Sequence, residues 1–141
     1  MLDDITAADK RHADTTSHAT ALWQQHWPDD PLVSIPGIGP ICASAVRGWW
    51  GEATQFATAK AAVAHAGLNP SVWSSGLTEA PSRRITKQGP AELRLALYQA
   101  ANVARRRDPQ LAEHYRRLMV ERGHNHISAN TAVARKLACR A

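Results

Sequence analysis

The sequence lacks the features of disulfide-bonded, zinc-binding and membrane proteins. Its two cysteines, Cys42 and Cys139, show no CxxC spacing, so they predict neither a disulfide framework nor a zinc site. The sequence contains no run of roughly 18 apolar residues, which is the length needed to cross a membrane. The polar, acidic N-terminus MLDDITAADK does not resemble a signal peptide. We therefore expect a cytoplasmic protein, and its 141 residues have room for one domain with a modest core.

The alternation of apolar and polar residues that indicates β-strands is also missing. Apolar residues instead recur at helical spacing, which predicts an all-α domain. The expected helices cover residues 4–27, 41–46, 58–66, the stretch between Pro90 and Asp108, 110–122 and 128–137. In residues 68–90 the apolar residues follow neither helical nor strand spacing, which predicts a long loop that contains several serines. Long loops in compact domains are often functional.

Charge is distributed unevenly along the chain. Residues 1–70 contain four Lys or Arg and seven Asp or Glu, whereas residues 71–141 contain thirteen and five, so the two halves carry net charges of −3 and +8. A basic half favours a polyanionic partner, because Lys and Arg neutralise phosphates and release their counterions. The alternative is a helix surface that is simply solvated.

A glycine-rich turn, Ile35–Pro40, stands between two predicted helical segments and matches the hairpin of a helix-hairpin-helix element. Gly37 and Gly39 allow a tight turn that exposes backbone N–H groups at a helix N-terminus, where a phosphate oxygen can bind. We expect both amides to face solvent. An ordinary turn between helices is the alternative.

The long loop contains Ser74, Ser75 and Gly76, followed by Arg83, Arg84 and Lys87. Serine is common in turns, so the hydroxyls alone are a weak signal. Cations close to a hydroxyl could hold a scissile phosphate and stabilise the charge that develops as the hydroxyl attacks.

Four sequence blocks carry a family resemblance. In order they are SIPGIGPICASAV, GWWGEATQFATAKAAVAHAGLNP, SSG and RRITKQGPAELRLALYQAANVA. Together they closely resemble the C-terminal transposase domain of the insertion-sequence one-hundred-and-ten family, which are DEDD-type transposases guided by a bridge RNA. The resemblance covers roughly residues 32–138 and implies an activity in DNA transposition and recombination.

The resemblance also implies roles for individual residues. The family's nucleophile is the serine before the loop glycine, which corresponds here to Ser75, with Ser74 as the nearest rival. A second family block corresponds to Ile85, Lys87 and Gly89, with Arg94 as the arginine that follows it. We expect Arg83, Arg84, Lys87 and Arg94 to hold phosphates.

Nothing in the sequence resembles the RuvC-like domain in which the family's four acidic residues bind magnesium. The resemblance therefore implies a DEDD nuclease domain, in cis or in trans, as the holder of magnesium, and no metal or other cofactor in this chain. Residues 1–31 would form a connector helix and residues 32–141 the transposase helical domain. The expected partners are DNA, a guide RNA, the nuclease domain and further copies of the chain, and the chain alone is expected to be inactive.

Two other functions stay open at this point. One is a non-catalytic helix-hairpin-helix module that grips the DNA backbone, and the other is a protein-interaction domain with an incidental basic face. His124 and His126 have no further ligand nearby in the sequence and are expected at the surface. Trp73 could stack on a base. The run Arg105–Arg107 suits the C-terminal end of a helix dipole as well as it suits a phosphate.

Overall fold

The computed structural model describes residues 1–71 and 84–141, and in them the chain is helical. The six α-helices are α1 (Leu2–His26), α2 (Pro40–Trp50), α3 (Ala59–His65), α4 (Ala91–Arg107), α5 (Pro109–Arg116) and α6 (His126–Ala138). Short 3-10 turns cover Pro31–Ser34 and Ala53–Gln55, and a π-helical turn covers Arg117–Glu121. Within the described residues, β-pairing is limited to one isolated bridge between Pro70 and Ile85. The predicted all-α class is confirmed.

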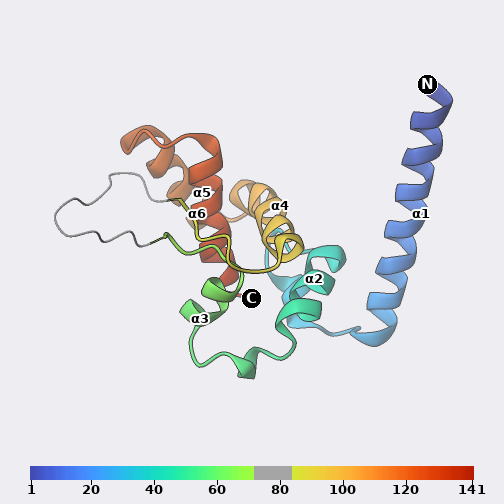
Figure 1. Ribbon diagram of the computed structural model, residues 1–141, viewed down its shortest axis with the longest axis horizontal. Helices are drawn as coiled ribbons and strands as arrows, with labels where there is room; N and C mark the ends of the chain where they lie inside the picture. Colours follow the sequence, from blue (N-terminus) through green and yellow to red (C-terminus); the bar gives the residue numbers. More distant parts are fainter. Residues whose placement is uncertain (72–83) are drawn as a thin grey trace.

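Helix α4 lies at the centre of the molecule, and α2, α5 and α6 pack around it (Figure 1). Small and aliphatic residues make this arrangement possible. Ala101 and Ala104 are fully buried and let neighbouring elements approach closely, while Leu97 fills the core beside Val133 and Leu137 of α6. Burial of these apolar side chains is the main force that holds the helices together.

Helix α2 is longer than the sequence predicted. The stretch around Gly48 was expected to end it near Val46, yet it continues to Trp50. The side chain of Trp50 is 5% exposed, and its ring meets Phe56 edge-on at 5.8 Å. The area buried by this tryptophan outweighs the weak helix propensity of glycine.

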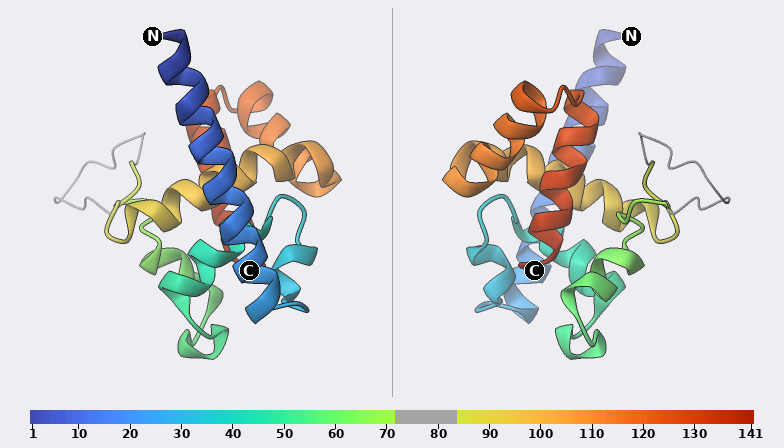
Figure 2. Two further views of the ribbon diagram at one scale, coloured as in Figure 1. Left: turned by 90° about the vertical axis from the view of Figure 1, so that its right-hand side faces the viewer. Right: turned by 90° about the vertical axis from the view of Figure 1, so that its left-hand side faces the viewer.

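Helix α1 extends away from the body of the domain (Figures 1 and 2). Residues 1–15 are all exposed, and the helix is held at its C-terminal end by Trp23, which is 3% exposed and stacks on Trp27 at 4.8 Å. No membrane-crossing helix is found in the described part of the chain, since none is both long and apolar enough. That residues 1–31 act as a connector stays a prediction.

Two carboxylates, buried Asp30 and partly buried Asp108, join elements of the domain. Asp30 is joined to Arg47 of α2 by a 2.7 Å ion pair and accepts a hydrogen bond from Leu32 N at 2.8 Å. Burial raises the pKa of Asp30, but the bonds from Arg47 and Leu32 outweigh this effect and the net pKa is lowered. Asp108 ends α4, accepts hydrogen bonds from the first amides of α5, and pairs with Arg140 beyond α6.

Candidate nucleic-acid interface

The glycine turn is packed tightly on helix α4. Ile38 is 3% exposed and anchors the turn, which is closed by a 3.0 Å bond from Ile38 N to Ile35 O. Gly37 has φ +95°, and a Cβ on it would lie 2.4 Å from the backbone oxygen of Ala100. Only glycine fits this close approach of two backbones.

The two turn glycines therefore differ. Gly37 is half-buried against α4, whereas Gly39 is exposed, and a Cβ on it would meet nothing within 4 Å. Gly39 precedes the first turn of α2, where no side chain caps the helix. The segment before the turn is the four-residue 3-10 helix Pro31–Ser34, so the full first helix of a helix-hairpin-helix is not seen here.

The serine loop begins and ends at a fixed base. Ser71 donates hydrogen bonds from N and Oγ to Arg84 O at 2.7 and 2.8 Å, and Thr86 N donates to Asn69 O at 2.8 Å. These bonds align the two ends of the loop in antiparallel directions. Ser74, Ser75, Trp73 and Arg83 lie outside the described residues, in the segment drawn in grey in Figure 1.

Two of the predicted phosphate-binding residues, Arg84 and Lys87, are exposed at this base. The backbone of Lys87 adopts φ 55°, which is unusual for a residue other than glycine. Its N–H donates to Gly67 O at 3.0 Å, which holds the residue in place. Backbone strain of this kind is common at functional sites, where the surrounding structure enforces it.

Arg94 also lies at the base of the loop, but its guanidinium contacts the protein backbone. Its Nη1 is 3.4, 3.4 and 3.3 Å from the backbone oxygens of Ala66, Lys87 and Gly89, respectively. Through these contacts, Arg94 links the end of α3 to the chain that follows the loop. The structure thus brings Arg94 to the backbone of Lys87, while the glycine turn contacts α4 about 10 to 15 Å further along the helix.

We expect Arg94→Ala to destabilise the domain by about 1 kcal/mol, because three carbonyl oxygens lose a shared donor. Thermal or urea denaturation measures this loss. Arg106→Ala is the matched control, since Arg106 is exposed on the same helix. Unchanged stability together with weaker DNA binding would instead support a phosphate contact by Arg94.

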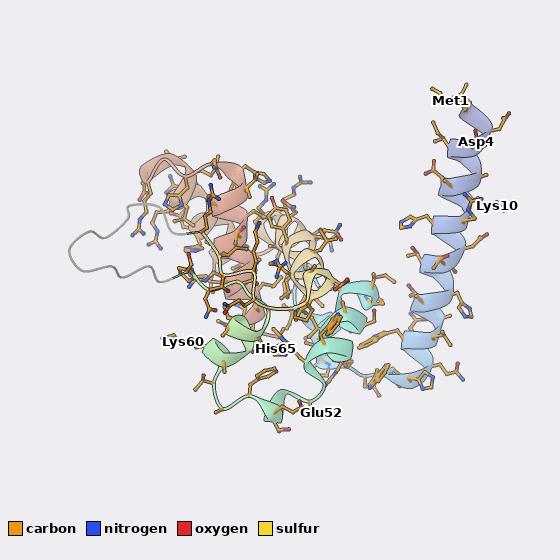
Figure 3. The ribbon with its side chains drawn as sticks, in the orientation of Figure 1. Met1, Asp4, Lys10, Glu52, Lys60 and His65 are labelled. Carbon is orange, nitrogen blue, oxygen red and sulfur yellow. The ribbon has the colours of Figure 1, made fainter. Side chains whose placement is uncertain are left out.

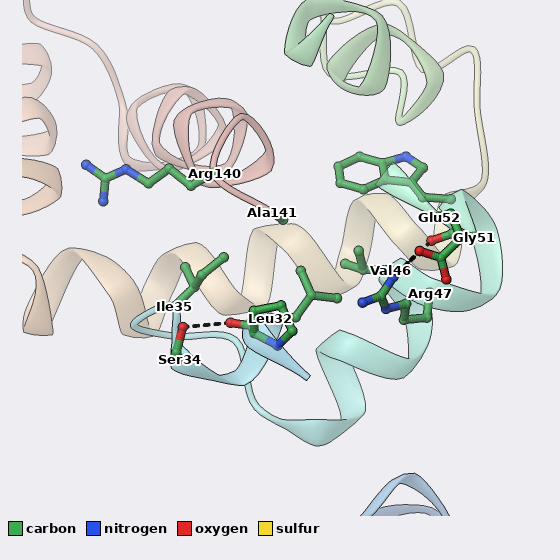
Figure 4. A pocket seen from close by; sticks show the side chains of 11 residues that line it. Leu32, Ser34, Ile35, Val46, Arg47, Gly51, Glu52, Arg140 and Ala141 are labelled. Atoms are coloured by element: carbon green, nitrogen blue, oxygen red, sulfur yellow. Dashed lines mark hydrogen bonds and ion pairs between the residues drawn. The ribbon is translucent and has the colours of Figure 1, made fainter. Parts of the chain in front are cut away.

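A pocket of about 350 Å³ lies beside the Asp30–Arg47 ion pair, between α2 and the end of the chain (Figure 4). Arg47 is neutralised there by Asp30 and approaches Glu52 at 3.5 Å. The indole N–H of Trp50 is buried without a hydrogen-bond partner among the described residues. The pocket therefore adds no unbalanced cation to a phosphate-binding surface.

Two further kinds of site in the described residues would be a group of side chains that binds a metal ion and a reactive thiol. These residues contain no group of three or more His, Cys, Asp or Glu that could hold a metal ion. Burial raises the pKa of Cys42 to about 11, so its thiol stays protonated at neutral pH.

A basic cluster on α5 and α6 was not predicted as a site from the sequence. Nitrogen-tipped side chains crowd this part of the molecule in Figure 3. The cluster comprises His114, Arg117, Arg122, Arg135 and Lys136, and we call it the α5–α6 cluster. The close spacing of His114, Arg117 and Arg122 was the available signal, but the sequence could not show that α6 lies next to them.

Comparison with known proteins identifies the family. The family model described as "Transposase IS116/IS110/IS902 family" matches residues 29–116, which is more than half of the chain. The chain belongs to this transposase family. It is also 28% identical over 136 residues to the "Insertion element IS110 uncharacterized 43.6 kDa protein" of Streptomyces coelicolor. That alignment covers 96% of this chain and 33% of the relative, so the chain spans about a third of the relative's length.

The match places the glycine turn, the loop base and α4 within the region typical of the transposase family. It extends through α5 and ends before the π-helical turn. Most of the α5–α6 cluster therefore lies beyond the matched residues, although the alignment with the Streptomyces relative covers nearly the whole chain.

Proposed function

We propose that this domain binds DNA and attacks a DNA phosphodiester with Ser75 during transposition. The observation that carries the proposal is the loop base, where antiparallel hydrogen bonds hold the two ends of the Ser75 loop beside exposed Arg84 and Lys87. Membership of the transposase family supports DNA as the substrate.

The proposed step exchanges one phosphodiester bond for another. Ser75 Oγ forms a bond to phosphorus, the bond from phosphorus to a deoxyribose oxygen breaks, and the proton lost by the serine is balanced by the one that the leaving oxygen takes up. Arg84 and Lys87 neutralise the phosphate, because cations beside the attacked group stabilise the charge of the transition state. A serine hydroxyl is a poor nucleophile until a base or a metal activates it.

We infer that a separate DEDD nuclease domain, in cis or in trans, completes the activity. In the family that this chain resembles, such a domain holds magnesium and a guide RNA directs the reaction. Every step that we assign to this chain is carried by its own residues, and the magnesium would be held by the nuclease domain.

A covalent-adduct assay tests the proposal. The chain is incubated with DNA, magnesium and a DEDD nuclease domain of the family, and the products are separated under denaturing conditions. We expect a protein–DNA adduct that survives denaturation when all components are present, and DNA binding without cleavage when the nuclease domain is omitted. Cleavage that leaves no protein attached to DNA would contradict serine attack.

A non-catalytic DNA-binding module is the second candidate. It is favoured by the glycine turn, where exposed Gly39 precedes the uncapped first turn of α2. Such a module would bind DNA through phosphates and form no adduct under any condition of the same assay.

We expect the combined replacement of Arg83, Arg84 and Lys87 by alanine to weaken DNA binding on all sequences. The plot of log affinity against log salt should become shallower by roughly one unit for each phosphate that the protein no longer neutralises. Fluorescence anisotropy over a series of salt concentrations measures the slope.

The control for this prediction is Lys10→Gln/Arg11→Gln/Lys60→Gln. It removes the same number of cations, from exposed positions on α1 and α3. Equal slopes for the two variants would show that the loop base makes no specific phosphate contact.

A further inference from the structure

We propose that the α5–α6 cluster is a second DNA-binding surface, which contacts the phosphate backbone of duplex DNA away from the serine loop base. This inference rests on the proposed function and names a further part of the chain that contacts the DNA. It is carried by cations from the π-helical turn, from the residue after it and from α6, which gather around the imidazole of His114 in α5.

The members of the cluster lie close together. Arg117 Nη2, in the π-helical turn, is 3.4 Å from Nδ1 of His114 in α5. Partial burial lowers the pKa of His114, and the charges of Lys136, Arg117, Arg122 and Arg135 lower it further. Positive charges from the π-helical turn, from the residue after it and from α6 therefore all act on the same imidazole.

Two carboxylates next to the cluster, among the described residues, are already bound to Arg116. Glu113 binds Arg116 with oxygen–nitrogen distances of 2.8 and 2.9 Å, and Glu121 approaches the same guanidinium at 3.3 Å. In the part of the chain that the structure describes, no carboxylate pairs within 4.0 Å with Arg117, Arg122, Arg135 or Lys136.

One donor of the cluster is also unused. Arg135 Nε is buried and has no hydrogen-bond partner among the described residues. Among the described residues these four cations have no ion-pair partner within 4.0 Å, so they repel one another, and binding of a polyanion relieves that repulsion. The exposed members Arg117, Arg122 and Lys136 can reach phosphates without rearrangement of the core.

The aromatic surroundings favour a duplex over a single strand. Surfaces that bind single strands offer aromatic rings on which bases stack. Among the described residues, Tyr115 is an aromatic neighbour of this cluster, and the guanidinium of Arg105 covers its ring at 4.4 Å from the centroid. Its hydroxyl is held by His126 Nδ1 at 2.8 Å. The ring is therefore occupied, and the surface offers charge for backbone contacts.

The test is Arg117→Gln/Arg122→Gln/Lys136→Gln in the full chain, with a labelled duplex of random sequence. Fluorescence anisotropy is measured over a series of salt concentrations. Removal of three phosphate-binding cations should reduce the salt slope by about 2 to 3 units and weaken binding on the order of 100-fold near 0.1 M salt. Circular dichroism should show an unchanged fold, since the three side chains are exposed.

Two control variants sharpen the test. Lys10→Gln/Arg11→Gln/Lys60→Gln changes the net charge equally and should keep the wild-type slope. Arg117→Lys/Arg122→Lys keeps the charge and should retain most of the affinity. Equal reductions of affinity in the two glutamine variants, or a wild-type slope in the cluster variant, would overturn the second surface.

The remaining outcomes separate this inference from the proposed function. Normal binding by the cluster variant, with a reduced slope after replacement of Arg83, Arg84 and Lys87, rejects only the α5–α6 surface. Salt-independent binding by the unmodified chain rejects DNA contact by both surfaces. A single-stranded RNA that binds more tightly than the duplex, and that the cluster variant no longer binds, overturns the assignment to duplex DNA.

Discussion

Ser75→Ala is expected to abolish the covalent protein–DNA adduct while DNA binding stays nearly unchanged. The substitution removes the single oxygen that would bond to phosphorus, and it leaves Arg84 and Lys87 in place to contact the phosphate. The measurement is a denaturing gel of labelled DNA after incubation with the nuclease domain and magnesium, with anisotropy as the binding readout.

Ser74→Ala is the matched control, because it removes the same group one residue earlier. We expect it to keep the adduct. Loss of the adduct in Ser74→Ala and its persistence in Ser75→Ala would identify Ser74, and not Ser75, as the nucleophile. Persistence in both variants would leave the non-catalytic DNA-binding module as the function.

Gly37→Ala should destabilise the domain by about 3 kcal/mol. The positive φ costs a residue with a Cβ about 1 to 2 kcal/mol, and the forced contact with Ala100 O adds about as much again. Domains of this size have total stabilities of about 5 to 15 kcal/mol, so the reduction would be a large fraction. Urea denaturation followed by circular dichroism measures it.

Gly39→Ala provides the comparison within the same turn. Gly39 has φ −95°, and its added Cβ would meet nothing within 4 Å, so stability should hardly change. Equal destabilisation by the two substitutions would show that the close approach of Gly37 to α4 is not what holds the turn. Reduced DNA binding in the stable Gly39→Ala protein would support contact at the N-terminus of α2.

Local patterns in the sequence predict where the helices lie, but not all of their ends. Proline and glycine mark the boundaries on either side of α4, and its apolar spacing identifies the face that is buried. The prediction of one helix over residues 110–122 was wrong in part, because α5 ends at Arg116 and a π-helical turn follows. A change of hydrogen-bond register within a continuous helical run has no clear signal in composition.

The candidate site was predictable only where its residues are neighbours in sequence. Arg84 and Lys87 were found because they follow the serine loop, and the structure places both at its base. The contact of Arg94 with Ala66 O could not be predicted, since that carbonyl group lies at the end of α3, far from Arg94 in sequence. The α5–α6 cluster was missed for a related reason, because Arg135 and Lys136 reach it only through the packing of α6 against α5.

Asp108 links two regions that are distant in sequence. Its carboxylate accepts bonds from Gln110 N and Leu111 N at 2.8 and 3.1 Å, and it pairs with Arg140 at the far end of α6. The bond from Leu111 lowers the pKa of Asp108, burial opposes this effect, and Arg140 lowers the pKa further. Because one carboxylate serves both regions, we expect fraying of the C-terminal residues to favour opening of the α4–α5 corner. The orientation of α5, and with it the basic surface, is thereby coupled to the last residues of the chain.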